Sequence, residues 1–271
     1  MIEEKKTPMR IAVLTDIHGN LPALQAVLAH AQRAGCDATV NLGDIASGPL
    51  WPRETIDFLM QFRWPTLAGN HERQVLTQAP ESMGASDAFA ARELGPLQRD
   101  WLRALPPTAW LDDEVFLCHG TPDSDLVYWL GSVTVDFGRG ASRGLRAAMP
   151  QEVRQRLGTG RATQATLALC GHTHVPHMVQ VEGGPLVVNP GSVGLQAYDD
   201  VHPQPHHVEN GTPHARYALV ERCAQGWQVQ HCAVAYDWEH AAQRAEANGR
   251  PDWADALRTG RVGRTEDDVQ A

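Results

Sequence analysis

Eight side chains able to bind a metal ion or to move a proton recur at equivalent points of the chain, each shortly after an apolar segment. Carboxylates, an amide and imidazoles make up the set, and no thiolate belongs to it. Such nitrogen and oxygen ligands suit two divalent ions roughly 3.5–4 Å apart, with open positions for a substrate. A structural zinc site fits poorly, because such sites favour closed sets of four ligands rich in cysteine. The eight residues are Asp16, His18, Asp44, Asn70, His71, His119, His172 and His174.

The segments around these residues alternate between strand and helix patterns. This alternation favours parallel pairing through right-handed crossovers. The carboxyl ends of parallel strands share one edge of a sheet, where open α/β proteins bind their ligands, so we expect the eight side chains to converge there. The expected strands are 11–14, 38–42, 64–68, 115–118 and 166–170, and the expected helices are 21–28, 52–62, one starting near residue 73, 79–105 and 151–157.

Each motif taken alone has a structural alternative. The stretch from Asp16 to Asn20 could be a loop that caps the next helix, and Asp44 could be a turn aspartate beside glycine. The same order of strand, glycine with polar residues, and helix occurs three times, which turns alone do not explain.

Beyond about residue 178 the pattern predicts mainly strands. Segments 178–181, 185–188, 216–220 and 227–234 indicate a second, largely antiparallel sheet, and 237–248 indicates a helix. Residues 199–214 are rich in histidine and proline. A solvated connection is the favoured interpretation, a lid or a loop that contacts the substrate is the alternative, and a third metal site is the least favoured. We expect one domain over 9–260, with flexible termini at 1–8 and 261–271.

Composition limits the functional classes. The chain has 271 residues and a formal net charge of −9, which argues against a stable nucleic-acid complex. It has no signal-peptide pattern and no membrane-spanning apolar run, and its five cysteines form no C-x-x-C pair. A cytoplasmic protein without membrane association is expected, with a phosphate-ester substrate still allowed because bound metals reverse the local charge. A homo-oligomer formed at a sheet edge is compatible with the sequence.

The ordered motifs D-x-H-G-N, G-D, G-N-H-E, H-G and G-H-T-H, from Asp16 to His174, resemble the calcineurin-like metallophosphoesterase superfamily. They are most similar to its small bacterial phosphodiesterase-type branch. The resemblance implies an α/β fold, a four-layer αββα sandwich with a dinuclear metal site at strand ends. It implies that Asp16, His18 and His174 bind one metal, that Asn70, His119 and His172 bind the other, that Asp44 bridges them, and that His71 is the catalytic, non-ligand histidine.

The reaction implied is hydrolysis of a small phosphodiester or phosphomonoester by a hydroxide that bridges two divalent ions, with the diester favoured. Manganese is the expected ion, and iron, zinc or nickel are alternatives. Other substrate classes in the family are phosphoproteins and dinucleoside polyphosphates. The other hypothesis is a non-catalytic, metal-bound scaffold or regulatory binding protein on the same fold.

The second motif departs from two branches of the family, the protein phosphatases and the dinucleoside polyphosphatases. There it continues with aspartate and arginine, whereas this chain has Ser47-Gly48-Pro49. The usual partner of the acid histidine and the usual phosphate clamp are therefore absent from their expected places. Arg73, or an arginine between 139 and 146, is the predicted substitute for the clamp, and Ser192 is expected to play a supporting role.

Overall fold

The structure is a computed structural model that describes residues 9–135 and 144–270. Two mixed β-sheets form its centre. The first contains β1 (Arg10–Leu14), β2 (Ala38–Asn41), β12 (Ala215–Cys223) and β13 (Gly226–Val234), in the order β13-β12-β1-β2. The second contains β3 (Thr108–Trp110), β4 (Val115–Cys118), β7 (Leu167–Leu169), β8 (His177–Gln180) and β9 (Leu186–Asn189), in the order β3-β4-β7-β9-β8.

Helices and two small hairpins surround these sheets. The hairpins are β5 (Gly131–Val133) with β6 (Leu145–Ala147), and β10 (Ala197–Asp200) with β11 (His206–Glu209). The helices are α1 (Leu21–Arg33), α2 (Pro52–Leu59), α3 (Asn70–Thr77), α4 (Ala85–Glu93), α5 (Pro96–Arg103), α6 (Pro150–Leu157), α7 (Trp238–Ala247), α8 (Pro251–Thr259) and α9 (Glu266–Gln270), with 3-10 turns at Pro80–Ser82 and Arg161–Gln164.

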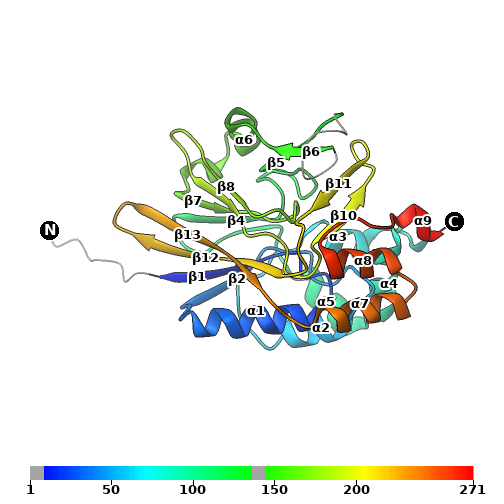
Figure 1. Cartoon of the computed structure of the whole chain (residues 1–271). Coiled ribbons are helices and arrows are strands. Elements are labelled where there is room, and N and C mark those ends of the chain that lie inside the picture. Colours follow the sequence, from blue (N-terminus) through cyan, green and yellow to red (C-terminus); the bar gives the residue numbers. More distant parts are fainter. Residues whose placement is uncertain (1–8, 136–143, 271) are drawn as a thin grey trace.

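The layers agree with the predicted fold class. Helices α1, α2, α5 and α7 lie on the outer side of the first sheet, and α6 lies on the outer side of the second (Figure 1). Strand β1 shows why the sheets stack. Ile11 and Val13 pack in the core between the sheets, while Ala12 and Leu14 pack toward the helices. Both faces of the strand are buried, so its sequence is a continuous apolar run. The αββα sandwich expected from the sequence is confirmed.

The expected separation into one parallel and one antiparallel sheet is wrong. Strands β12 and β13 extend the sheet of β1, with Ile11 opposite Val220, and the hairpin of β8 and β9 extends the sheet of β4 and β7. The reason lies in β12. Ala218 and Val220 face the core between the sheets, while Tyr217 faces the helices. Both faces of this strand are therefore buried, as they are in a sheet covered on both sides.

Segment 64–68 does not form the predicted strand. It makes one parallel bridge, between Asn41 and Thr66, with Leu67 donating its N–H to Asn41 O at 2.9 Å. Pro65 has no N–H for a ladder, so pairing stops at this bridge. The segment still runs beside β2, and α3 starts at Asn70 rather than near residue 73.

The C-terminal segment, for which the sequence predicts flexibility, includes a short helix. Over 261–270 the chain follows α8 and ends in α9. Among the described residues three ion pairs hold it: Glu266 contacts Arg250 at 2.8 Å, Arg264 contacts Asp255 at 2.7 Å, and Arg261 contacts Glu209 at 3.9 Å. The partners cap α8, lie within α8 and end β11, so local composition did not reveal them. Residues 1–8 lie outside the described residues.

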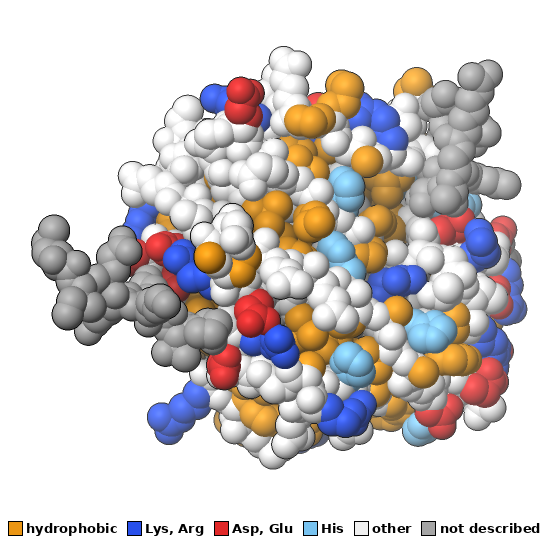
Figure 2. Space-filling view, turned by 60° about the vertical axis from the view of Figure 1, so that its left-hand side comes forward, with side chains coloured by type: hydrophobic (Ala, Val, Ile, Leu, Met, Phe, Trp, Pro, Cys, Tyr) orange, Lys and Arg blue, Asp and Glu red, His pale blue; other side chains and the backbone are white. Residues whose placement is uncertain are grey.

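Acidic and basic side chains are scattered over the face shown in Figure 2, and hydrophobic side chains with several histidines occupy its middle. In the described ranges, no helix is both long enough and apolar enough to cross a lipid bilayer.

Candidate metal centre

Seven side chains from both sheets converge at the carboxyl ends of their strands. Strand β1 leads to Asp16 and His18, β2 leads to Asp44, α3 begins with Asn70, β4 leads to His119, and β7 leads to His172 and His174. We call these seven residues the metal-ligand centre. Six of them are buried, and His172 is partly buried. The structure therefore places every predicted ligand in one small region.

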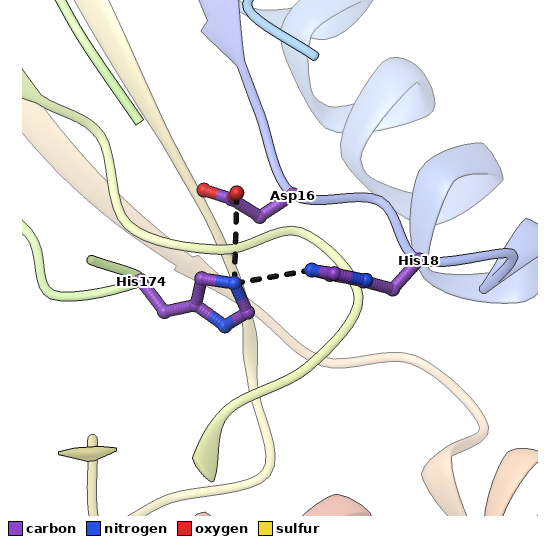
Figure 3. Close-up of side chains that lie close together, drawn as sticks. All are labelled: Asp16, His18 and His174. Carbon is purple, nitrogen blue, oxygen red and sulfur yellow. Dashed lines mark hydrogen bonds and ion pairs between the residues drawn. The ribbon is translucent and has the colours of Figure 1, made fainter. Parts of the chain in front are cut away.

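One group of ligand atoms comes from Asp16, His18 and His174, which lie within 4.8 Å of one another (Figure 3). His174 Nε2 lies 3.5 Å from Asp16 Oδ1 and 3.1 Å from His18 Nε2. The three side chains point toward a common point, as the ligands of a single ion do.

The second group comes from Asp44, His119 and His172, also within 4.8 Å of one another. His119 Nε2 lies 3.0 Å from Asp44 Oδ2 and 3.1 Å from Asn70 Oδ1, so the amide oxygen joins this group. The same nitrogen is 4.0 Å from Asp16 Oδ1, which belongs to the first group. The two groups are therefore adjacent.

Backbone carbonyls orient three of the imidazoles. The Nδ1 of His18 donates to Ser47 O at 2.7 Å, that of His119 to Leu42 O at 2.9 Å, and that of His174 to Leu195 O at 2.8 Å. A carbonyl accepts only, so Nδ1 carries the hydrogen and Nε2 is free to bind a metal. Burial, and next the charge of His174, lower the pKa of His18 to about 4, so its imidazole is neutral near pH 7.

The backbone is strained at the same places. In the described ranges, the non-glycine residues with positive φ are Asp16, His18, Asp44, His172 and His174, with φ between 51° and 66°. Such conformations are uncommon without glycine and cluster at functional sites, where surrounding structure holds them. Gly69 illustrates the tight fit, because a Cβ there would overlap the Asp44 carboxylate.

The donor set fits divalent cations. Asp16 and Asp44 are almost fully buried, and such carboxylates need a compensating positive charge. Burial raises the pKa of Asp44, but the charge of His119 and other histidines outweighs burial and holds it well below its usual range. Buried imidazole nitrogens, carboxylates and one amide oxygen, without sulfur, match manganese, iron, zinc or nickel.

His71 lies beside the centre and not among its ligands. Its ring centroid is 5.4 Å from that of His18, and its Nδ1 is 2.8 Å from Oδ1 of Asp87, a residue of α4 that is 4% exposed. Burial lowers the pKa of His71, but the carboxylates of Asp44 and Asp87 outweigh burial and raise it to about 10. Asp87 thus places a carboxylate on His71 although the second motif lacks its usual aspartate.

Glu72 supports the centre from behind. Its buried carboxylate accepts hydrogen bonds from the N–H groups of Asp44, Ile45 and Gly69, each at 2.8 Å. These bonds fix the turn that carries Asp44 to the start of α3. Ser192 has a similar structural role, because its Oγ donates to Asp16 O at 2.9 Å and accepts from Leu195 N.

A cavity of about 920 Å³ opens over His18, Asp44, Asn70, His172 and His174. Beyond them it is lined by parts of α4, β5, α6, β10, α8 and α9, which we call the outer cavity. Tyr128 and Tyr198 stand at the junction of the two parts. Their hydroxyls are 2.7 Å apart, and their rings pack against His172 and His174.

The histidine- and proline-rich segment is more than a solvated connection. Its strands β10 and β11 form a hairpin in which His206 is buried, with Nε2 3.0 Å from the Tyr128 hydroxyl. Asp199, Asp200 and His202 line the cavity. The hairpin is thus part of the wall, and the favoured interpretation from the sequence is corrected.

The predicted replacements for the phosphate clamp are engaged elsewhere. Arg73 makes a bidentate pair with Asp125, at 2.7 and 2.9 Å, and Arg146 makes one with Glu152, at 2.8 Å for both bonds. Arg139 and Arg143 lie outside the described residues.

Sequence reasoning missed Asp87, Tyr198 and His206. Asp87 lies in an alanine-rich helical segment with no spacing relation to His71. Tyr198 directly precedes the segment 199–214 interpreted as a loop, and His206 lies within it. Histidine enrichment was the signal available for His206, and it pointed to a solvated loop.

Comparison with known proteins agrees with this geometry. A model of the calcineurin-like phosphoesterase superfamily domain matches residues 9–204. An uncharacterized protein of Methanocaldococcus jannaschii is 24% identical over 267 residues, covering 90% of this chain and 94% of that protein. A metallophosphoesterase from Sphaerobacter thermophilus has a similar fold, with a TM-score of 0.66, 24% identity, and coverage of 93% of this chain and 99% of that one. A hypothetical protein from Pyrococcus horikoshii OT3 gives a TM-score of 0.71, 19% identity, and coverage of 94% and 100%. Since the family model matches well over half of its length, this chain belongs to the calcineurin-like phosphoesterase superfamily.

Proposed function

We propose that the protein is a metal-dependent phosphoesterase that hydrolyses a small phosphodiester or phosphomonoester at a dinuclear site, with the diester favoured. The observation that carries the proposal is the adjacency of two nitrogen-oxygen ligand groups, linked through His119 and Asp16, beside the pair of His71 and Asp87. A phosphoryl group needs charge neutralisation, a nucleophile and a proton for the leaving oxygen, and this arrangement contains residues suited to all three.

The ligand groups suggest a division of tasks. Asp16, His18 and His174 would hold one ion, while Asn70, His119 and His172 would hold the other, with Asp44 shared between them. Two divalent ions there would lower the pKa of a water molecule and neutralise charge on the phosphoryl oxygens. Manganese(II) is the ion we propose, since the set lacks sulfur and accepts hard and borderline cations.

His71 would protonate the leaving oxygen. Asp87 engages its Nδ1, which leaves Nε2 as the nitrogen that can give a proton toward the cavity. A carboxylate on the far nitrogen also fixes the orientation of the ring. Asp87 is thus a positioning residue. The side chain of His71 is 29% exposed, so a bound substrate can reach it.

The size of the cavity favours a phosphodiester over a substrate as small as inorganic phosphate. Its volume of about 920 Å³ lies near the upper end of small-molecule sites and has room for two substituents on phosphorus. A non-catalytic scaffold is the other candidate. The buried Asp87 pairs with His71, which lies beside the centre without being one of its proposed ligands. Such a pair is useful for proton transfer in catalysis and has no evident use in a scaffold.

The test is hydrolysis of bis-p-nitrophenyl phosphate and p-nitrophenyl phosphate by protein stripped of metal and then supplied with manganese, iron, zinc or nickel. We expect turnover that requires the added ion, with the diester hydrolysed faster. Asp44→Asn should abolish measurable turnover, because it removes the charge shared by the two ligand groups.

Asp113→Asn is the matched control, since Asp113 is exposed and outside the cavity. Its activity should equal that of the unmodified protein. Protein that binds two ions per chain yet hydrolyses neither ester with any of them would contradict the enzyme and favour the scaffold.

A further inference from the structure

Three arginines line the cavity, and two of them are neutralised by carboxylates. Arg250 pairs with Asp252 at 2.6 Å and with Glu266 at 2.8 Å, and Arg264 pairs with Asp255. The third, Arg156 on α6, makes no ion pair within 4.0 Å in the part of the chain that the structure describes. Arg156 is therefore the cavity cation with charge left for a ligand.

Backbone and hydroxyl groups hold Arg156 in a fixed position. Its guanidinium donates to Trp129 O at 3.0 Å, to Gly131 O at 2.9 Å and to Ser132 Oγ at 2.8 Å. These acceptors are neutral, so they orient the fork without cancelling its charge. Partial burial lowers the pKa of the guanidinium, because the cation loses hydration, and an anion bound beside it would restore that lost stabilisation.

Among the described residues, Arg156 together with Arg146 and Glu152 carries one net positive charge. Glu152 lies one turn earlier on α6 and also lines the cavity, but it is held in a bidentate pair by Arg146. Two arginines thus share one carboxylate. The other acidic residues of the outer cavity lie on other elements: Asp87 on α4, Asp199 and Asp200 on β10, Asp252 on α8 and Glu266 on α9. In Figure 1, α6 lies at the top, whereas α8 lies lower, at the right-hand end of the sheets.

Arg156 is close to the metal-ligand centre. Gly131, whose carbonyl accepts from Arg156, packs against Thr173: a Cβ built on Gly131 would lie 3.1 Å from Thr173 Cγ2. Thr173 stands between His172 and His174 in the chain. Gly131 alone thus separates Arg156 from the loop that carries two proposed ligands, His172 and His174. If the phosphorus of a substrate lies at the metal-ligand centre, one of its substituents can reach Arg156.

We propose that Arg156, oriented by Ser132, binds a second anionic group of the substrate, so that the substrate is a phosphoester with a phosphate or carboxylate on one arm. This inference rests on the proposed function, because it assumes that the scissile phosphoryl group lies at the metal-ligand centre. Three of its five N–H groups donate to neutral acceptors that orient the guanidinium, and the two that remain can bind oxygens of either anion.

Three synthetic diesters with the same p-nitrophenyl leaving group test the proposal. Their second arms are propyl, 2-carboxyethyl and 2-phosphatoethyl, so they differ in the second anion alone. With manganese-loaded protein we expect KM about tenfold lower for the better anionic arm than for propyl, the size expected of charge-assisted hydrogen bonds. The arm with the lower KM identifies the anion as phosphate or carboxylate.

Arg156→Gln should erase this preference, and its effect on the propyl diester should be several-fold smaller. Arg156→Lys keeps the charge without the fork, so an intermediate preference is expected, and it replaces the glutamine variant if that one does not fold. Arg154→Gln is the matched control: Arg154 is on the same helix, exposed and outside the cavity lining, and its preference should be that of the unmodified protein.

Calorimetric titration of the manganese-loaded proteins with the same diesters separates the two proposals, since it detects binding even when a diester is not hydrolysed. Tighter binding of an anionic arm that depends on Arg156, without hydrolysis of any diester, would keep this inference and overturn the proposed function. Equal binding of all three diesters, or an equal loss for all three in Arg156→Gln, would overturn the inference and leave Arg156 as a structural link between α6 and β5.

Discussion

The metal-ligand centre and the outer cavity, although they share one hollow, are constructed differently. In the centre, residues at strand ends adopt unfavourable positive φ values, and backbone carbonyls orient the imidazoles of His18, His119 and His174. In the outer cavity, side chains on short helices and hairpins are held by ion pairs, such as Arg264 with Asp255, and by hydrogen bonds to neutral groups, as at Arg156. The centre is fixed by the sheets, whereas the outer cavity is assembled from pieces added at their ends.

This contrast assigns different work to the two regions. A buried centre whose side chains are hydrogen-bonded to backbone groups keeps its ligands in place, so it is suited to determine which reaction is catalysed. A partly exposed ion pair such as Arg264 with Asp255 contributes little to stability and can be rearranged at small cost. The outer cavity is thus suited to determine which ester enters. Substitutions in the centre should abolish catalysis for every substrate, while those in the outer cavity should change the ranking of substrates.

The largest effect among the predictions below concerns the pair of His71 and Asp87. We expect His71→Asn to lower kcat by about 10²- to 10⁴-fold, since it removes the proton donor. Asp87→Asn should cause a smaller loss, and the double variant should be no slower than His71→Asn, because Asp87 acts through the imidazole. Measured kcat values for the four proteins complete the cycle.

A leaving-group comparison sharpens that prediction. A phenyl diester has a more basic leaving oxygen than a p-nitrophenyl diester, so loss of the proton donor should slow it more. Asp100→Asn is the control, because Asp100 is exposed on α5 and pairs with Arg103 alone. Additive losses in the double variant would show that Asp87 does not act through His71.

An intermediate effect is expected at Glu72. In the native protein the two carboxylate oxygens of Glu72 accept three backbone N–H groups. In Glu72→Gln only one oxygen remains as an acceptor, and the new NH₂ group would point at a backbone N–H donor. We expect the free energy of unfolding to fall by about 1–3 kcal/mol. Manganese affinity should fall by about 10- to 100-fold, since the turn carrying Asp44 loosens.

Chemical denaturation and metal titration measure these two quantities. Glu93→Gln, an exposed substitution at the end of α4, should change neither. If Glu72→Gln were destabilised but bound manganese normally, Glu72 would belong to the scaffold alone, and the described link between Glu72 and the Asp44 ligand would be wrong.

The smallest effect is expected at Tyr198, on the boundary between the two regions. Tyr198→Phe keeps the ring against His174 but removes the hydroxyl that contacts Tyr128 and donates to His172 O at 3.3 Å. The free energy of unfolding should fall by about 0.5–1.5 kcal/mol. The kcat for diesters should change little, because the ring still supports the ligand.

Tyr217→Phe makes the same change in the core, where the hydroxyl contacts His30 Nδ1 at 2.6 Å, so a similar stability loss with unchanged kcat is expected there. A loss of kcat in Tyr198→Phe as large as that in His71→Asn would show that the metal-ligand centre and the outer cavity do not have separate tasks.

Much of the centre could be read from the sequence, because ligand-type residues follow apolar strands at short, fixed spacings. Each motif lies within one strand-loop unit, as with Asp16 and His18 after β1. Local spacing and the rule that parallel strands end at one edge were enough to predict convergence. Sheet membership was not readable, because β12 and the hairpin of β8 and β9 both look like plausible partners of either sheet.

The sequence alone determined the fold class, the family and the residues that meet in the centre, since these depend on local pattern and order along the chain. Tertiary structure alone decided what supports and surrounds them. Asp87 reaches His71 from another helix, and His206 reaches Tyr128 across 78 positions. Among the described residues Arg156 has no ion-pair partner, since Glu152 pairs with Arg146. Such pairings depend on which side chains share a wall after folding, and no spacing in the chain records that.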